Sequence, residues 1–185
     1  MDVKPILRMG NPLLRQIAAS VEYADIEEIR TLVTEMIASM NQAGGVGLAA
    51  PQIGELSRVI IFSVPADRMQ REDESADMSG IPQTVLINPE ITPLSDEMAL
   101  GWEGCLSVPD LRGLVPRYTH IRYCGLDMNG TRLEREAKGF HARVVQHEVD
   151  HLDGILYPER MTDMRNLVYC SEQKAFMAAL NDVDG

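Results

Sequence analysis

Apolar residues recur at helical spacing in three segments of the chain. Residues 25–40 carry them along one face, and Asp25 is placed to cap the first turn. Residues 140–152 have an apolar stripe and, beside it, a face that carries His147, Glu148 and His151. A further helix is predicted over about residues 171–180. The spacing therefore predicts three amphipathic helices, and the second combines a core-facing side with reactive side chains.

Short runs of β-branched and apolar residues predict strands between these helices. The runs occupy residues 58–64, 84–88 and 119–126, and Asp127-Met128-Asn129-Gly130 is typical of a hairpin turn. Residues 66–80 are rich in Asp and Glu and lie between two prolines, which predicts an exposed acidic loop. Strands grouped ahead of a late helix favour an α+β fold over a parallel α/β sheet.

Composition limits the possible class of protein. A length of 185 residues suits one domain, which we expect to span residues 1–185. No apolar run is long enough to cross a bilayer, and the first 20 residues lack the apolar region of a signal peptide, so no membrane partner is expected. A net charge of −11 disfavours nucleic acid as a partner, because that binding needs a basic surface. Three widely separated cysteines favour free thiols.

The segment His147-Glu148-Val149-Asp150-His151 carries the clearest chemistry. In a helix, residues four apart stack one turn above another, so both imidazoles can bind one metal ion. Glu148 then lies within reach of a metal-bound water, an arrangement used for metal-assisted hydrolysis. The alternative is a surface helix with two histidines at this spacing by accident. The apolar stripe favours the metal site, because a buried histidine without a partner is costly.

A catalytic metal site needs a third protein ligand, and Cys105 is the best candidate. No histidine follows His151, and Tyr157 occupies the position of the third histidine in one large metalloprotease class. Cys105 lies in the glycine-containing segment Gly101-Trp102-Glu103-Gly104-Cys105-Leu106-Ser107, and a Cys/His/His set leaves a fourth position open for water. Taken alone, a cysteine is more often a small buried apolar residue. We expect that role for the other cysteines, and structural or exposed positions for the other histidines: Cys124, Cys170, His120 and His141.

A third segment, Gly44-Gly45-Val46-Gly47-Leu48-Ala49-Ala50-Pro51-Gln52, is rich in small residues. A phosphate loop is disfavoured, since no Lys-Ser/Thr pair follows and the glycine spacing is not that of a dinucleotide site. Small residues instead allow close approach of a peptide or ligand. Gln52 offers an amide donor that could face a developing oxyanion, although it could also be an ordinary polar cap after Pro51.

These three segments together resemble the polypeptide deformylase family. Their order and separations fit, and weaker similarity extends over roughly residues 3–161. The resemblance implies a hydrolase that removes the formyl group from the N-terminal formylmethionine of newly made proteins and releases formate. It also implies an α+β fold with antiparallel β-sheets packed around a central helix that carries the His-Glu-x-x-His motif. The matching segments are residues 45–52, 103–107 and 146–154.

The resemblance further implies one divalent metal ion and a role for each matching residue. Iron(II) is the expected native ion, and zinc, nickel or cobalt can replace it in relatives. The resemblance implies four groups of residues: three metal ligands, one acid/base, two groups that face the formyl oxygen and five residues that bind substrate. In this order, these are Cys105, His147 and His151; Glu148; Gln52 and the backbone N–H of Leu106; and Val46, Gly47, Arg112, Phe140 and Val144. Arg143 stands where relatives often have an apolar pocket residue, so a more polar rim is expected.

The expected partners are N-formylmethionyl nascent peptides, and the protein is expected to act as a monomer. Its expected location is the bacterial cytoplasm, or an organelle if a transit peptide has been removed. Transient ribosome contact is disfavoured: relatives are thought to use a basic C-terminal extension, whereas residues 162–185, an expected helix and tail, carry more acidic than basic residues.

Two other functions have to be compared with the hydrolase on the basis of the sequence. A peptidase that cuts internal bonds would need an open substrate cleft and a different third ligand, and the sequence indicates neither. A structural metal module, or an inactive binding protein, would have no use for the Glu148 carboxylate beside a ligand. Glu148 therefore separates the hydrolase from this second rival.

Overall fold

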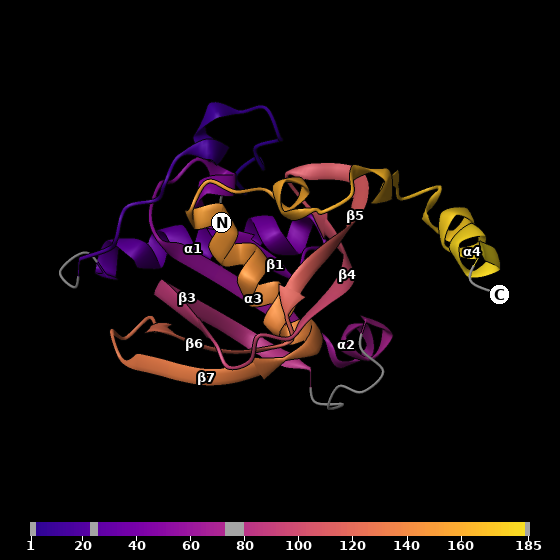
Figure 1. Ribbon diagram of the computed structural model, residues 1–185. Coiled ribbons are helices and arrows are strands. Elements are labelled where there is room, and N and C mark those ends of the chain that lie inside the picture. Colours follow the sequence, from indigo (N-terminus) through magenta and orange to yellow (C-terminus); the bar gives the residue numbers. More distant parts are fainter. Residues whose placement is uncertain (1–2, 23–25, 73–79, 184–185) are drawn as a thin grey trace.

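Two antiparallel sheets and a long buried helix organise the fold (Figure 1). The computed structural model describes residues 3–22, 26–72 and 80–183. Within these residues the larger sheet has the strand order β1-β2-β3-β6-β7, and the smaller sheet has the order β4-β5-β8. The α+β class and the antiparallel pairing predicted above are confirmed. The strands are β1 (Gly47–Ala49), β2 (Val59–Val64), β3 (Ile81–Pro93), β4 (Met98–Cys105), β5 (Val108–Tyr118), β6 (His120–Leu126), β7 (Arg132–Lys138) and β8 (Leu167–Tyr169); the α-helices are α1 (Ile26–Gln42), α2 (Ala66–Glu72), α3 (Gly139–Leu152) and α4 (Gln173–Val183).

Strand β2 is apolar along nearly its whole length because helices cover both faces of the larger sheet. Successive side chains of a strand point to opposite faces. Val59 and Ile61 belong to the cluster that contains the buried face of α1, whereas Ile60 and Phe62 belong to the cluster that contains α3. The continuous apolar run of β2 therefore reflects the burial of both of its faces.

Helix α3 contacts strands of both sheets, including β1, β2 and β5. Its apolar stripe is buried at Ala142, Val145 and Leu152, and partly buried at Val149. The chain leaves the helix at Gly154, whose φ of 72° is left-handed. A side chain there would also clash with the backbone of Arg15, since an added Cβ would lie 2.7 Å from its carbonyl oxygen. This stop fixes the end of α3 against the N-terminal segment.

The turn between β6 and β7 confirms the predicted hairpin. Asp127 Oδ1 accepts hydrogen bonds from the backbone N–H groups of Asn129 and Thr131, and Gly130 has a φ of 73°. The carboxylate replaces backbone acceptors inside the turn, which is why Asp is favoured there.

Several strands were not predicted from the sequence. Strands β4 and β5 contain glycines and prolines that normally interrupt strands, yet they pair along almost their full length. Strand β7 is an edge strand with five exposed charged residues among its seven positions, so it shows little apolar alternation. Strand β8 pairs with β5 over only three residues. These elements are fixed by long-range pairing, which local periodicity does not report.

Two predictions are wrong where the structure can test them. The first half of the predicted acidic loop is the helix α2, and its Met69 is buried in the core; residues 73–79 lie outside the described residues. Cys170 is exposed and Cys124 is only half-buried, so neither is the fully buried residue expected. The predicted cap Asp25 also lies outside the described residues. Among the described helices, none is both long and apolar enough to cross a bilayer.

His141 lies on α3 against the larger sheet and should make stability depend on pH. Its ring is 5.6 Å from that of Tyr123 and 5.9 Å from that of Phe62. Burial, aided by the charge of Arg135, lowers the pKa of His141 from 6.5 to about 4. The unfolded chain therefore binds a proton that the folded chain excludes, and stability falls as pH drops from 6.5 towards 4.

We expect His141→Gln to weaken this pH dependence. Between pH 7 and pH 5 the wild-type protein should lose about 2 kcal/mol more stability than the variant. Urea unfolding of both metal-loaded proteins at the two pH values measures the difference, and metal loss common to both cancels. Equal losses would mean that His141 titrates normally in the folded chain.

Candidate metal centre

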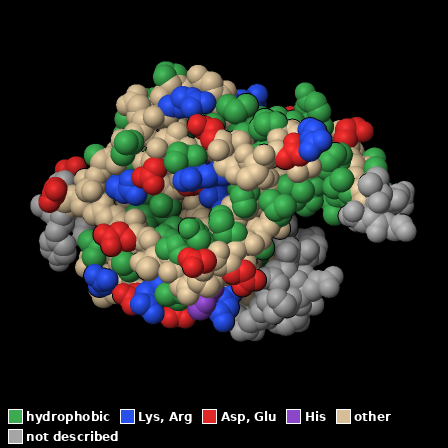
Figure 2. Space-filling model, in the orientation of Figure 1, with side chains coloured by type: hydrophobic (Ala, Val, Ile, Leu, Met, Phe, Trp, Pro, Cys, Tyr) green, Lys and Arg blue, Asp and Glu red, His purple; other side chains and the backbone are tan. Residues whose placement is uncertain are grey.

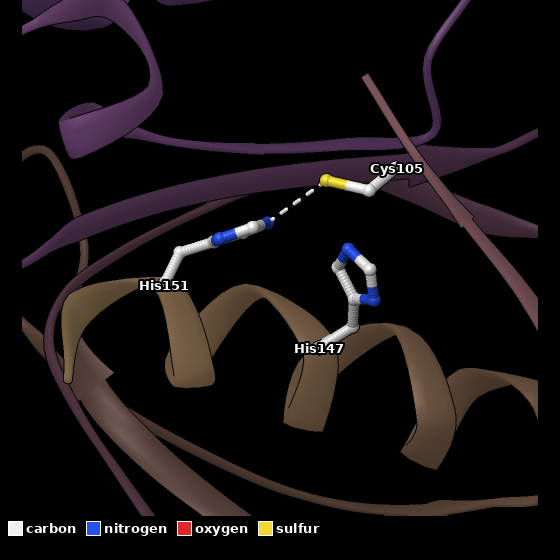
Figure 3. Close-up of side chains that lie close together, drawn as sticks. All are labelled: Cys105, His147 and His151. Atoms are coloured by element: carbon white, nitrogen blue, oxygen red, sulfur yellow. Dashed lines mark hydrogen bonds between the residues drawn. The ribbon is translucent and has the colours of Figure 1, made fainter. Parts of the chain in front are cut away.

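Cys105, His147 and His151 converge, although they come from separate parts of the chain (Figure 3). Cys105 ends β4, and the two histidines lie one turn apart on α3. The Cys105 Sγ lies 3.3 Å from His151 Nε2, and one donor atom from each of the three residues lies within 4.8 Å of the others. The two imidazole rings are 5.0 Å apart and nearly perpendicular. The proposed third ligand therefore lies beside the histidine pair.

The surroundings of Cys105 favour the thiolate, the form that binds metals. The backbone N–H of Ser107 points to Sγ at 3.4 Å. Burial on its own would raise the pKa of Cys105, but the adjacent His151 and His147 outweigh it and hold the pKa well below the ordinary thiol value. A shift of the β4–β5 register between Gly104 and Cys105 marks where the hairpin turns towards α3.

Glu103 orients His147 from the side opposite the thiol. Its Oε2 lies 2.8 Å from His147 Nδ1, which leaves Nε2 of that imidazole for an ion. The carboxylate also accepts two hydrogen bonds from Arg117 and one from Arg143. Burial opposes ionisation of Glu103, but His147 and Arg117 outweigh it and lower its pKa. No role for Glu103 was predicted from the sequence, although it lies in the segment that contains Cys105.

The donor set fits a divalent ion. One thiolate and two imidazoles are ligands that zinc and iron accept, and a set of three leaves a position for water or substrate. His147 is held by Glu103 through its other nitrogen, as metal-bound histidines usually are by a carboxylate or carbonyl. His151 Nδ1 is buried and has no hydrogen-bond partner among the described residues. The arrangement supports a catalytic site better than a four-ligand structural one.

Glu148 lies in the same cleft and is buried, with 5% of its surface exposed. Its Oε2 has no hydrogen-bond partner within the described part of the chain. Burial raises the pKa of Glu148 to about 7, against the opposing effect of His147 and His151. A carboxylate with a pKa near neutrality can both accept and donate a proton at physiological pH. Glu148 therefore has the environment of a general acid/base.

Gly47, the first residue of β1, leaves the space that the Glu148 side chain occupies. A Cβ added at this glycine would lie 2.6 Å from Cδ of Glu148. We expect Gly47→Ala to displace the carboxylate and to lower kcat by roughly 10- to 100-fold, because misplacement by about 1 Å is enough for such a loss. Steady-state kinetics measures it, with thermal unfolding of the metal-loaded protein alongside. A wild-type kcat in a folded variant would mean that the position of Glu148 is unimportant.

Gln52 is buried in the short 3-10 helix that follows β1. Its Oε1 accepts a hydrogen bond from the backbone N–H of Ala49 at 2.8 Å, which fixes the amide. Its Nε2 lies 3.1 Å from Ser107 Oγ and 3.5 Å from Cys105 Sγ. The amide donor is thus aimed at the metal centre, whereas the simple capping role considered from the sequence involves only the Oε1 contact.

A cleft of about 670 Å³ opens onto this centre. All residues predicted for the site line it except His151, which is 1% exposed. The rim is polar at Arg143, as expected, and this side chain donates to the carbonyl of Val115 at 2.7 Å. Several lining residues had no role predicted from the sequence, and among them are Trp102, Cys170 and Gln173.

Comparison with known proteins identifies the family. The model of the family described as polypeptide deformylase matches residues 3–167. The chain is 56% identical to "Peptide deformylase 1" of Bordetella pertussis and 55% identical to "Peptide deformylase 2" of Bordetella bronchiseptica, each over 90% of this chain and 92% of the relative. It is also similar to the Met-Ala-Ser-bound crystal structure of a class I type b peptide deformylase from Acinetobacter baumannii, with a TM-score of 0.78, 42% identity, and coverage of 86% of this chain and 99% of that one.

The family match and the geometry of the centre agree. The matched residues include all three candidate ligands, Glu148 and Gln52. The chain belongs to the polypeptide deformylase family.

Proposed function

We propose that this chain is a metal-dependent hydrolase that removes the formyl group from the N-terminal formylmethionine of new proteins. One observation carries the proposal: a Cys/His/His donor set lies at a cleft lined by a buried glutamate, Glu148, whose Oε2 lacks a hydrogen-bond partner among the described residues. The family to which the chain belongs acts in this way. The Met-Ala-Ser bound to the Acinetobacter relative supports a peptide with N-terminal methionine as the product class.

Cys105, His147 and His151 would hold the ion, and Glu148 would manage the protons. When bound, a divalent ion lowers the pKa of a water molecule and polarises the formyl carbonyl. Glu148 then accepts a proton from the attacking water and later passes it to the departing amine. Water oxygen bonds to the formyl carbon, the carbon–nitrogen bond breaks, and formate and a free N-terminus result. The raised pKa of Glu148 suits both proton transfers.

Gln52 and the backbone N–H of Leu106 would stabilise the formyl oxygen as charge builds on it. The fixed orientation of the Gln52 amide supports this role, because a donor already in place needs no reorganisation during the reaction. Leu106 follows Cys105 in the turn between β4 and β5, and it lines the cleft. Both groups lie on the side of the cleft that holds the thiol.

An apolar pocket beside the centre would accept the methionine side chain. Val46, Phe140 and Val144 line the cleft next to His147, and Gly47 allows the peptide backbone to come close. A flexible thioether fits such a pocket by dispersion contacts. Arg112, on the β5 wall, would hold the peptide main chain.

The metal is proposed to be iron(II), with zinc, nickel and cobalt as substitutes. The test is formate release from formyl-Met-Ala by protein prepared without oxygen and reloaded with each metal in turn. We expect activity with iron(II), zinc, nickel or cobalt and none after chelation. Formate release that survives complete metal removal would contradict the proposal.

We also propose a setting for the enzyme. The two Bordetella relatives named above are bacterial, which supports action on nascent chains in a bacterial cytoplasm. We propose a monomer as the active form. Ribosome docking through a basic C-terminal extension is disfavoured, since the described part of α4 has a single basic residue, Lys174.

A further inference from the structure

The last structural unit of the chain reaches the substrate cleft. We name residues 167–183, which contain β8 and α4, the C-terminal arm. Figure 1 shows α4 standing out from the two sheets, with its first turn nearest the body. Cys170 and Gln173 of the C-terminal arm nevertheless line the same cleft as His147 and Glu148. The family match ends at residue 167, so almost all of the arm lies beyond the matched residues.

We propose that the C-terminal arm and Trp102 form an outer subsite for the peptide residues that follow formylmethionine and the second residue. This inference rests on the function proposed above. The cleft extends from Glu148, where the formyl group reacts, to Gln173 at the start of α4. An extended peptide advances about 3.3 Å per residue, so the residues that follow the second extend from Glu148 towards this outer end. A formylated dipeptide would leave that end empty.

Three contacts hold the C-terminal arm against the β4–β5 hairpin. Strand β8 pairs with β5 in the register Leu111–Tyr169 to Gly113–Leu167, and the N–H of Cys170 donates to the carbonyl of Asp110 at 2.8 Å. The rings of Trp102 and Phe176 meet edge to face at 6.0 Å and an interplanar angle of 86°. The C-terminal arm is thus held in place by backbone and side-chain contacts before a peptide binds.

The chemistry of this wall suits a peptide. Trp102 supplies an apolar surface that a side chain can cover, and Figure 2 shows further hydrophobic side chains where α4 joins the body. Gln173 Oε1 accepts a hydrogen bond from Arg112 at 3.4 Å. A carboxamide can donate through its nitrogen at the same time, so Gln173 can offer a donor to a peptide carbonyl. Arg112 links this amide to β5, where the main chain of the peptide is proposed to run.

The test compares formyl-Met-Ala with formyl-Met-Ala-Ser-Leu as substrates. We expect the wild-type enzyme to have the lower KM for the longer peptide. Gln173→Ala should raise that KM about fivefold, the effect of one lost hydrogen bond, with a much smaller change for the dipeptide. Phe176→Ala should act in the same direction by loosening α4 from Trp102. Lys174→Ala is the matched control: Lys174 is exposed on α4 and does not line the cleft, so this variant should behave as wild type.

A second readout does not depend on turnover. Trp102 is the single tryptophan of the chain, so its fluorescence reports on this subsite alone. The product peptide Met-Ala-Ser-Leu should change the emission of the metal-loaded enzyme, whereas Met-Ala should not, and Gln173→Ala should weaken the tetrapeptide response about fivefold.

Equal responses to the two lengths of peptide, or equal effects of Gln173→Ala on both, would overturn the outer subsite. A wild-type enzyme that releases no formate from either peptide would contradict the proposed function instead. In that case the fluorescence titration still decides whether the C-terminal arm binds peptide.

Discussion

Replacing Glu148 by Gln should abolish most deformylation while the metal stays bound. The glutamine has the shape of the carboxylate but can neither accept the proton of the attacking water nor return it to the amine. Loss of general acid–base catalysis costs roughly 10²- to 10⁴-fold, and we expect kcat for formyl-Met-Ala to fall within that range. The amide also suits the site sterically, because Gly47 leaves space for a side chain of this length.

The measurement pairs formate release with metal analysis of the same preparation. Glu90→Gln is the control, since Glu90 is exposed on β3 and lies outside the cleft lining, and it should keep both activity and metal. Loss of metal in Glu148→Gln would make Glu148 a ligand rather than an acid/base. A nearly unchanged kcat would support the rival interpretation of a binding protein or a structural metal module.

The candidate metal centre was predictable from the sequence because two of its proposed ligands depend on a local rule. His147 and His151 share a face of α3 by helical spacing alone, and the apolar stripe on the other side indicates that the helix is buried. Cys105 required a chemical argument about ligand number, supported by the resemblance to a known family. Its approach to His151, at 3.3 Å, depends on the β4–β5 hairpin, which periodicity did not predict.

The features that could not be predicted from the sequence depend on contacts between distant segments. Glu103 is one residue of an unpredicted strand, and its role appears only when β4 lies beside α3 and Arg117 of β5 lies beside both. Gln173 is likewise ordinary in sequence, and it becomes part of the cleft because β8 pairs with β5. The failure at residues 66–72 has a related cause: charged residues predicted a loop, whereas buried Met69 ties α2 to the core. The sequence pattern around a residue depends on its neighbours along the chain. The roles of these residues depend on tertiary contacts, which that pattern does not indicate.

Replacing Cys105 by Ser should have the second large effect, on metal affinity. A hydroxyl stays protonated near neutral pH and is a poor ligand, whereas the thiol here is held in its ionised form by His151 and His147, which lower its pKa despite burial. Loss of a partner that only orients a ligand costs about 10- to 100-fold in affinity, and loss of the ligand itself should exceed that. Metal content after anaerobic purification, and release to a chelator over time, measure the change.

Cys124→Ser is the control for this experiment, because Cys124 is a half-buried thiol on β6, away from the cleft lining. It should retain metal and activity. If Cys105→Ser keeps the full metal content and resists the chelator like the wild type, the thiol is not a ligand. The ion would then need a third donor from elsewhere, yet among the described residues Cys105 is the one thiol grouped with His147 and His151. Loss of metal in Cys105→Ser would therefore support a three-ligand catalytic centre. Retention of metal in that variant would leave a histidine pair without catalytic geometry.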